Sequence, residues 1–354
     1  MLQLIEYKDI SEDHFLIDVR SEGEYKEATI NGSFNLPILN DEERKLIGTL
    51  YKENVEQAKI LGVKIGSEKL PEIFNTVLKI YKGNKNLVFF CARGGMRSGV
   101  LSSMLEALGI KLYKLKDGYK GYRKFVLEAI PKINEDITYI VLHGNTGVGK
   151  TRILHKLIEL GCDVLDLEGC ANHRGSLLGD VGLPKKQSQK QFESNIYHSL
   201  VKIKSPFVFV EAESRRIGNV FIPPYIHEKM KNGIHIFLDA SLNFRAKVIL
   251  EEYLKGENAK EDILGCLDKL ERYISKENIA RYKELVQNDE YEFVVEDLMK
   301  KYYDPMYTHT SNTYEYDLNL QITDLDKCSE TIFNWYKESI VKNQLEEENQ
   351  NEVE

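Results

Sequence analysis

Residues 137–161 read ITYIVLHGNTGVGKTRILHKLIELG: an apolar run, a glycine-rich turn and a stretch with apolar residues at helical spacing. This order predicts a strand, a loop and a helix. The turn fits the pattern G-x-x-x-x-G-K-[ST] in full, and such loops cradle a diphosphate through their backbone N–H groups. We expect Lys150 to reach terminal phosphate oxygens and Thr151 to be able to hold a magnesium ion. The predicted diphosphate site consists of Gly144, Asn145, Thr146, Gly147, Val148, Gly149, Lys150 and Thr151.

Three more apolar runs follow the glycine-rich turn, in CDVLDLEG, PFVFVEAES and GIHIFLDAS, with helical stretches between them. Strands that alternate with helices predict a parallel sheet, so we expect a P-loop NTPase-like α/β domain. From Leu242 to about Asp297 the sequence is rich in charge and helical in pattern, which predicts a helical C-terminal part. The pattern does not specify what is attached to the bound diphosphate.

A carboxylate that assists at the diphosphate is expected at the end of another strand. Glu211 and Glu213 in FVFVEAES and Asp239 in IHIFLDA are the candidates. Each of them is equally consistent with a helix cap or a solvated carboxylate. The choice among the three therefore stays open at the level of sequence.

The first 130 residues also alternate short β-rich runs with helical patterns. HFLIDVR, NLVFFCA and KLYKLK are expected to be strands of a second parallel sheet, which precedes the diphosphate-binding part in the chain. A proline and a shift to polar residues in AIPKINED indicate a domain boundary. We expect domains at 1–130 and 131–340, and an acidic, disordered tail at 341–354.

Residues 90–99 read FCARGGMRSG and place Cys91 directly after an apolar run. If the next helix begins near Ser98, the residues between must fold back over the sulfur. Gly94 and Gly95 allow positive φ, so that backbone N–H groups can turn inward as an anion-binding nest. The residues of this loop are Ala92, Arg93, Gly94, Gly95, Met96, Arg97 and Ser98.

Three features of this loop favour the thiolate form of Cys91. A helix N-terminus brings partial positive charge, and Arg93 and Arg97 bring formal charge. A thiolate is nucleophilic at neutral pH, so Cys91 is the predicted catalytic nucleophile. The alternative, a cysteine buried only for packing, does not account for two arginines and two glycines in the six positions after it.

Two segments carry candidate contacts to RNA. The stretch KLYKLKDGYKGYRK, residues 111–124, interleaves cations that neutralise phosphates with tyrosines that stack on unpaired bases. Residues 165–194 read as a long polar loop with basic side chains. Both segments are also consistent with ordinary solvated surface. The candidates are Lys114, Lys116, Tyr119, Lys120, Tyr122, Arg123, His173, Arg174, Lys185 and Lys186.

Composition sets the remaining bounds. The chain has 354 residues and a net charge of −8, which argues against nonspecific binding to polyanions but allows a local basic face. Its five cysteines show no paired C-x-x-C spacing, so we expect neither disulfides nor a structural metal site. No long apolar run predicts a membrane span, and the first residues lack the pattern of a secretory signal, so we expect a cytoplasmic protein.

The N-terminal motifs resemble those of rhodanese domains. The resemblance implies a persulfide or a related chalcogen intermediate on Cys91. Arg97 lies six positions after Cys91, which gives C-x5-R, the loop length of rhodanese-like phosphatases rather than that of most sulfurtransferases. A phosphatase therefore remains an alternative. The motifs that carry the resemblance are LIDVRSEGEYKEATINGSFNLP (16–37), the strand that ends at Cys91, and LYKLKDGYKGYRKF (112–125).

The order of the two domains is more specific than either domain alone, and over residues 1 to about 335 the chain resembles the tRNA 2-selenouridine synthase family. The motifs are CARGGMRSG, NDEERKLIGTLYK, LDLEGCANHRGSLLG, SQKQFES and VEAESRRIG. The resemblance implies that selenium from selenophosphate replaces the sulfur of 2-thiouridine at the tRNA wobble position. It also implies an S-geranylated intermediate formed from geranyl diphosphate.

This resemblance also sets the expected partners. They are a tRNA that carries wobble 2-thiouridine and an enzyme that supplies selenophosphate, while selenophosphate and geranyl diphosphate are co-substrates. We expect no tightly bound cofactor, magnesium as an optional ion, and a monomer. Whether Cys91 attacks selenium or its loop only holds the phosphate-like part of the donor stays open.

Two other classes of function remain possible on the residues alone. One is a rhodanese-type sulfurtransferase or C-x5-R phosphatase fused to a nucleotide-binding domain, which would turn over thiosulfate and cyanide or hydrolyse phosphoesters. The other is a noncatalytic, ATP-responsive RNA-binding protein. In that case alkylation of Cys91 would change nothing.

Overall fold

The computed structural model describes residues 2–82, 86–174, 187–254, 258–305 and 314–342. The chain forms two compact units. The first contains residues 1–132 and 187–198, and the second contains residues 133–186 and 199–354. Lys185, Lys186 and most of the acidic tail lie outside the described residues.

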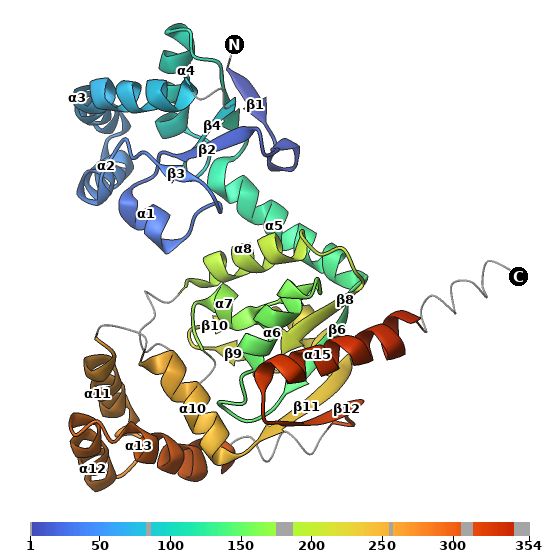
Figure 1. Ribbon diagram of the computed structural model, residues 1–354. Helices are drawn as coiled ribbons and strands as arrows, with labels where there is room; N and C mark the ends of the chain where they lie inside the picture. The colour runs from blue at the N-terminus through green and yellow to red at the C-terminus, as the bar shows by residue number, and fades with distance from the viewer. Residues whose placement is uncertain (1, 83–85, 175–186, 255–257, 306–313, 343–354) are drawn as a thin grey trace, which may run out of the picture. The chain divides into compact units, whose positions relative to one another are not determined.

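The first unit is built on a five-stranded parallel sheet (Figure 1). The strand order is β1–β5–β4–β2–β3, and every pair in it is parallel. β4 lies at the centre and is almost wholly buried, as expected for a strand that is covered on both faces. The strands are β1 (Gln3–Ile5), β2 (His14–Asp18), β3 (Phe34–Asn35), β4 (Asn86–Phe90) and β5 (Leu112–Leu115).

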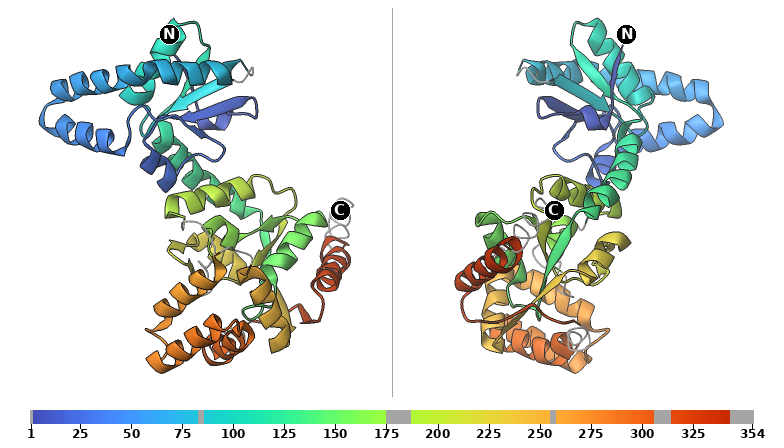
Figure 2. Two further views of the ribbon diagram at one scale, coloured as in Figure 1. Left: turned by 60° about the vertical axis from the view of Figure 1, so that its left-hand side comes forward. Right: turned by 90° about the vertical axis from the view of Figure 1, so that its right-hand side faces the viewer.

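Helices connect these strands. Two of them, α3 and α4, contribute Ile73, Val77, Leu101 and Leu105 to a core with the sheet residues Ile17 and Phe89. α2 and α3 form a helical hairpin, blue in Figure 2. Asn40 and Asn54 cap the two helices of the hairpin, which is why each begins where it does. The helices are α1 (Glu22–Glu27), α2 (Asp41–Glu53), α3 (Val55–Tyr81), α4 (Met96–Ala107) and α5 (Gly118–Glu135).

The first unit also takes in a segment from much later in the chain. Helix α8 (Gln189–Leu200) packs on it through side-chain hydrogen bonds of its N-terminal half. Gln191 accepts from the Thr29 backbone N–H at 2.8 Å and donates to the Asn31 side chain at 2.6 Å. The sequence-based division had assigned this segment to the second domain. The first boundary between the units falls between residues 132 and 133, inside the segment AIPKINED, and α5 continues across it to Glu135.

The second unit holds another five-stranded parallel sheet, in the order β12–β11–β6–β8–β7. Its central strand β6 precedes the glycine-rich turn, and α6 (Lys150–Glu159) follows that turn. Ile153, Leu154 and Leu157 of α6 pack against Ile140 and Leu142 of the sheet. The strands are β6 (Thr138–His143), β7 (Val164–Leu165), β8 (Phe207–Glu211), β11 (Ile234–Ala240) and β12 (Leu318–Ile322).

Shorter elements complete this sheet domain. The segment CDVLDLEG, expected to be a strand, has strand geometry only at β7, because Asp166 caps the short helix α7 (Leu167–Ala171) directly after it. β9 (Arg216–Ile217) and β10 (Val220–Phe221) form a small antiparallel hairpin. The remaining helices are α9 (Pro224–Lys231), α10 (Leu242–Tyr253) and α15 (Leu325–Trp335), and the π-helix η3 (Tyr336–Val341) follows.

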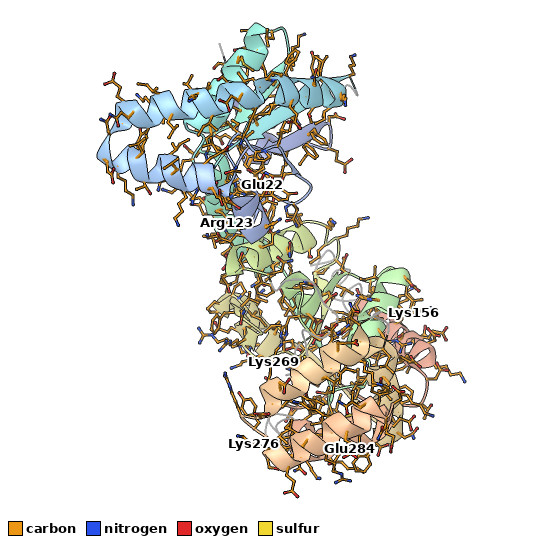
Figure 3. All side chains as sticks on the ribbon, turned by 90° about the vertical axis from the view of Figure 1, so that its left-hand side faces the viewer. Glu22, Arg123, Lys156, Lys269, Lys276 and Glu284 are labelled. Atoms are coloured by element: carbon orange, nitrogen blue, oxygen red, sulfur yellow. The ribbon has the colours of Figure 1, made fainter. Side chains whose placement is uncertain are left out.

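The helical part has its own core. Leu267, Ile279, Tyr282 and Leu298 are buried in it, while the charged residues Lys269, Lys276 and Glu284 are exposed (Figure 3). Its helices are α11 (Ala259–Leu270), α12 (Lys276–Gln287), α13 (Tyr291–Leu298) and η2 (Met299–Tyr303). Within the described ranges, no helix has both the length and the apolar character that a membrane span requires. The fold class expected from the sequence, two parallel-sheet domains and a helical C-terminal part, is confirmed.

Candidate functional site

The glycine-rich turn of the second unit has the shape of a phosphate loop. It leaves β6 at the edge of the sheet where the parallel strands end, and α6 begins at Lys150. The Lys150 side chain folds back over the loop, and its Nζ donates a hydrogen bond to the Gly144 carbonyl at 2.8 Å. This contact holds the ammonium group over the loop, where a diphosphate oxygen would take the place of the carbonyl.

A cavity of about 70 Å³ opens on this loop. That volume gives room for on the order of five water molecules, which is about the size of a diphosphate. Of the predicted residues, the structure brings together on its walls the loop, one of the three candidate acids and one of the RNA candidates. The lining residues from these groups are Thr146, Gly147, Gly149, Lys150, Thr151, Arg174 and Glu213.

The three candidate acids occupy different places. Glu213 lines the cavity, whereas Glu211 is fully buried and accepts from the Glu168 backbone N–H at 2.8 Å. Asp239 is exposed on β11 and is not among the cavity residues, so the structure does not bring it to the phosphate loop. The cavity instead contains Glu168, which accepts a hydrogen bond from Thr151 at 3.1 Å. Sequence reasoning missed Glu168, although it directly follows the β7 segment.

Burial and mutual repulsion change the acidity of these carboxyls. Burial, followed by the carboxylates of Asp166 and Glu168, raises the pKa of Glu211 well above its ordinary value. Burial, followed by Glu168, also raises the pKa of Glu213, and the Lys150 ammonium only partly opposes this. The pocket therefore retains carboxyl protons more strongly than free carboxyls do.

Thr151 is the candidate magnesium ligand of the phosphate loop. The Thr151 hydroxyl faces a carboxylate, as an optional magnesium ion would require. Among the residues that the structure describes, no group of three or more His, Cys, Asp and Glu side chains has the arrangement of a metal site. The expectation that Thr151 can hold an optional magnesium ion stays a prediction.

His173 and Arg174 follow α7 and have different surroundings. His173 is buried against Gly218, at which an added Cβ would lie 2.7 Å from the imidazole ring. Arg174 lines the cavity of the phosphate loop, with its guanidinium 4.8 Å from the centroid of the Tyr253 ring. Of the two RNA candidates, only Arg174 is thus placed to reach an anion, and that anion would lie in the phosphate loop.

In the first unit, Cys91 lies at the carboxyl end of β4, under a loop that leads into α4. α4 begins at Met96, two residues earlier than expected. Gly94 has φ +60°, as predicted, but Gly95 has φ −89°, so only one of the two glycines uses the left-handed region. The early helix start accounts for the difference, because Gly95 is the N-cap residue of α4.

The surroundings of the Cys91 sulfur favour its ionisation. Burial raises the pKa of the thiol, but the Ser98 hydroxyl donates to Sγ at 3.2 Å, and the backbone N–H groups of Ser98 and Arg93 also donate. With the charge of Arg97, these contacts hold the pKa of Cys91 below its ordinary value. Arg93 itself is exposed, and its contribution comes through the backbone. Cys91 is only 3% exposed, so a donor reaches the sulfur through this loop or after the loop moves.

Arg97 is held by a residue that sequence reasoning missed. Glu24 of α1 binds its guanidinium through both carboxylate oxygens, at 2.5 and 3.1 Å. Burial raises the pKa of Glu24, but the bond and charge of Arg97 outweigh burial and lower the pKa to about 2. An oxyanion in the cysteine loop must therefore compete with Glu24 for Arg97. Glu24 lies in the segment SEGEYKE, where nothing local indicates this partner.

The segment KDGYKGY serves as the seat of the cysteine loop. The backbone N–H groups of Tyr119 and Lys120, in the first turn of α5, donate to the carbonyls of Cys91 and Ala92, both at 2.9 Å. Gly118 has φ +55°, and an added Cβ would lie 2.2 Å from the Cys91 carbonyl oxygen. Only glycine fits this position. The end of β4 and the start of α5 are thus locked together.

This packing corrects the expectation that tyrosines of this segment stack on RNA bases. Tyr119 is 7% exposed and Tyr122 is fully buried, so neither ring offers a free face. The Arg20 guanidinium covers the Tyr119 ring at 4.1 Å from its centroid, and Ser194 contacts the Tyr122 hydroxyl. Their alternating pattern with lysines reflects one buried and one exposed side of the segment.

The cations of the same segment are partly engaged within the first unit. Lys114 donates to the Gly94 carbonyl at 2.9 Å and so supports the cysteine loop, and Lys116 pairs with Glu6 at 2.8 Å. Arg123 binds the Glu193 carboxylate and the Lys190 carbonyl of α8. Lys120 is exposed. Of these candidates, Lys116 and Lys120 keep the exposure that an RNA contact requires.

Two family models match the chain, and the gap between them contains the first boundary between the units, although the second model includes residues 187–198, which pack with the first unit. The rhodanese-like domain model matches residues 3–125, and the AAA domain model of tRNA 2-selenouridine synthase matches residues 137–340. Among solved structures, an N-terminal domain from a Clostridium difficile 630 protein is 37% identical and covers 35% of this chain and 99% of that chain, at a TM-score of 0.34.

Curated proteins named tRNA 2-selenouridine synthase are similar to this chain over much of its length. The tRNA 2-selenouridine synthase of Nitrosomonas eutropha is 36% identical over 245 residues, which cover 68% of this chain and 63% of that protein. The enzyme of the same name from Pseudomonas syringae pv. syringae is 31% identical over 327 residues, which cover 83% of this chain and 87% of that protein. The matched part thus spans less than two thirds of the first relative and most of the second. By the domain models and these relatives, the chain belongs to the tRNA 2-selenouridine synthase family.

Proposed function

We propose that this protein is a tRNA 2-selenouridine synthase, which replaces the sulfur of 2-thiouridine at the wobble position with selenium from selenophosphate. The observation that carries the proposal is that one chain of this family combines an ionisable thiol loop with a fully formed phosphate loop. Each loop suits one of two successive chemical steps.

The phosphate loop suits the first step, alkylation of the thiocarbonyl sulfur by geranyl diphosphate. The sulfur attacks C1 of the geranyl group, the C1–O bond breaks, pyrophosphate leaves and the uracil ring loses its N3 proton. Lys150 and Arg174 line the cavity with positive charge where the negative charge of the leaving pyrophosphate would accumulate. Alkylation is useful because an alkylated sulfur departs as a thiol, whereas a thiocarbonyl sulfur is a poor leaving group.

The cysteine loop suits the second step, delivery of selenium. The Ser98 hydroxyl and inward-pointing N–H groups favour the thiolate form of Cys91, and such donors also suit a selenium anion or the phosphate part of selenophosphate. The selenium of selenophosphate adds at C2, the geranyl thiol leaves with a proton, and water cleaves the Se–P bond so that phosphate is released and selenium stays on C2. On this proposal the partners are a tRNA with wobble 2-thiouridine and an enzyme that makes selenophosphate, and the protein acts as a cytoplasmic monomer.

Mass spectrometry of wobble nucleosides tests the proposal. Purified protein, 2-thiouridine tRNA, geranyl diphosphate and selenophosphate should yield 2-selenouridine, with the S-geranyl form as an intermediate. Cys91→Ala should block selenium incorporation and leave geranylation intact. The matched control is Cys266→Ala, which removes another buried thiol. Full selenouridine formation by Cys91→Ala would contradict the role of Cys91.

The phosphate loop is tested in the same assay. Lys150→Ala should lower geranyl transfer at least a hundredfold, on the scale of removing one charged donor from a transition state. The same variant should still convert previously geranylated tRNA to selenouridine. Unchanged geranyl transfer would reject this role for the loop, and rapid turnover of thiosulfate with cyanide, or of phosphoesters, would favour the sulfurtransferase or phosphatase instead.

A further inference from the structure

The cavity at the phosphate loop has two chemically different walls. One wall is polar and consists of the loop with Lys150 and Arg174. Helix α10 contributes Val248, Ile249, Glu252 and Tyr253 to the lining. The Tyr253 ring lies 4.8 Å from the Arg174 guanidinium, so the aliphatic surface that this helix presents to the cavity is that of the buried Val248 and the half-buried Ile249.

Helix α10 is joined to the phosphate loop by a hydrogen bond and by side-chain packing. Arg245 donates to the Thr146 carbonyl at 3.2 Å and is held in turn by a two-pronged ion pair with Asp304 at 2.8 Å. The Ile249 side chain lies against the apex of the loop, since a Cβ added at Gly147 would be 2.8 Å from Ile249 Cδ1. The distance between the diphosphate cradle and the Ile249 side chain is therefore set by the fold.

The size of the cavity decides where a longer substrate must go. About 70 Å³ accommodates a diphosphate but not a ten-carbon chain in addition. The chain has to leave past a wall of the cavity, and an apolar chain gains free energy by lying on apolar surface. A nucleoside attached to the diphosphate would instead leave its polar groups against aliphatic side chains, which is unfavourable.

Resting on the proposed function, we propose that the α10 wall binds the prenyl chain and that Ile249 sets the length of chain the enzyme accepts. Val248 and Tyr253 flank Ile249 in the lining and guide the first isoprene unit away from the diphosphate. A larger residue at 249 narrows the exit, and a smaller one widens it.

A second cavity on the other side of α10 provides the contrast. It measures about 540 Å³ and shares Val248 with the first, but ion pairs cross its surface. Arg152 pairs with Glu251 at 2.7 Å, and Lys156, labelled in Figure 3, pairs with Asp326 at 3.3 Å. Charged walls suit a hydrocarbon poorly, so we do not place the chain there. Phe244 of α10 lines the second cavity but not the first, so it serves as a matched control for Ile249.

The experiment compares chain lengths. Wild-type protein and the variants Ile249→Ala, Ile249→Phe and Phe244→Ala are assayed for prenyl transfer to 2-thiouridine tRNA from dimethylallyl, geranyl and farnesyl diphosphates. Ile249→Ala should raise the kcat/KM for farnesyl diphosphate relative to that for geranyl diphosphate roughly tenfold. Ile249→Phe should lower the kcat/KM for geranyl diphosphate relative to that for dimethylallyl diphosphate, also roughly tenfold. Phe244→Ala should keep the wild-type ratios, and inhibition by inorganic pyrophosphate should be equal in all four proteins.

The possible outcomes separate the inference from the function on which it rests. If wild-type protein transfers no prenyl group, the proposed function fails. If it does, but both Ile249 variants keep the wild-type ratios or Phe244→Ala changes them, the chain does not lie on the Ile249 wall. A loss of pyrophosphate inhibition in both Ile249 variants would also overturn the inference, because Ile249 would then serve the loop and not the chain.

Discussion

At the scale of single residues, the reactivity of Cys91 depends on a hydroxyl seven positions later. We predict that Ser98→Ala raises the pKa of Cys91, because the hydrogen bond at 3.2 Å stabilises only the thiolate. Alkylation by iodoacetamide near pH 7 should slow several-fold, and the midpoint of its pH dependence should move upward. Ser103→Ala, an exposed position on the same helix, should leave the midpoint unchanged. Equal midpoints in all three proteins would contradict the role of Ser98.

A second residue-scale prediction concerns acid stability. The pKa of Glu24 is about 2 in the folded protein, because the bond to Arg97 outweighs burial, and an unfolded glutamate titrates near roughly 4.3. The ionised carboxylate therefore stabilises the fold above about pH 5, and this contribution is lost as the pH falls toward 2. In urea unfolding, Glu24→Gln should be less stable than wild type at pH 7, with the gap closing toward pH 3. Glu22→Gln, on the same helix, should show no such gap.

Residue identity was predictable where chemistry and local sequence coincide. Cys91 follows a strand and precedes a helix, while Lys150 and Thr151 begin the helix that follows a strand and a glycine-rich loop, so their places could be inferred from spacing alone. Glu24 and Glu168 could not, since each meets its partner through the fold, 73 and 17 positions away in the sequence. Tyr122 shows the opposite error, because an aromatic residue among lysines has the same local pattern whether it is buried or exposed.

At the scale of elements, the contact between β4 and α5 depends on the absence of one side chain. We predict that Gly118→Ala disrupts the cysteine loop, because its Cβ would overlap the Cys91 carbonyl at 2.2 Å as well as strain a residue with φ +55°. Gly32→Ala is a matched control for the strain, because it has φ +79° but no atom within 4 Å of the added Cβ. The control should cost about 1 kcal/mol, and Gly118→Ala should cost clearly more. Equal melting temperatures for the two variants would contradict the overlap.

Strands and helices with a clear apolar run or a strong hydrophobic periodicity were predictable from the sequence, whereas very short elements were not. β4, β6 and β11 are long apolar runs, and their neighbours α4 and α6 have clear helical spacing. β7 has only two residues, and the capping side chain of Asp166 starts a helix where the strand was expected to continue. Capping is a local competition between a side chain and the backbone, and apolar periodicity does not report it.

At the scale of the whole molecule, the first unit is completed by a segment from beyond the phosphate loop. We predict that Gln191→Ala destabilises the first unit by about 1–3 kcal/mol, since it leaves the Thr29 N–H without its acceptor. Hydrogen exchange should speed up in residues 14–35 and not in β6 or β8. Gln287→Ala, at an exposed position on α12, should leave both regions unchanged. Faster exchange confined to the second unit would contradict the packing of α8.

The two-domain architecture could be read from the sequence because each domain repeats strand and helix in order. The packing of residues 187–198 with the first unit could not be predicted in this way. Domain boundaries were inferred from composition, and composition carries no information about long-range packing. Two hydrogen bonds of residues 187–198 join asparagine and glutamine side chains that are 160 and 164 positions apart in the sequence. Such side chains look like ordinary surface in a sequence.

The burial of Cys91 also affects how quickly its sulfur would be oxidised. A thiolate that attacks chalcogens readily is equally prone to oxidation, and its higher oxides are irreversible. Because Cys91 is only 3% exposed under the loop of residues 92–98, we expect oxidants and bulky thiols to react with it more slowly than with an exposed thiolate. If Cys91 handles selenium as proposed, the same burial also slows the approach of the selenium donor, so protection of the sulfur and speed of turnover oppose each other.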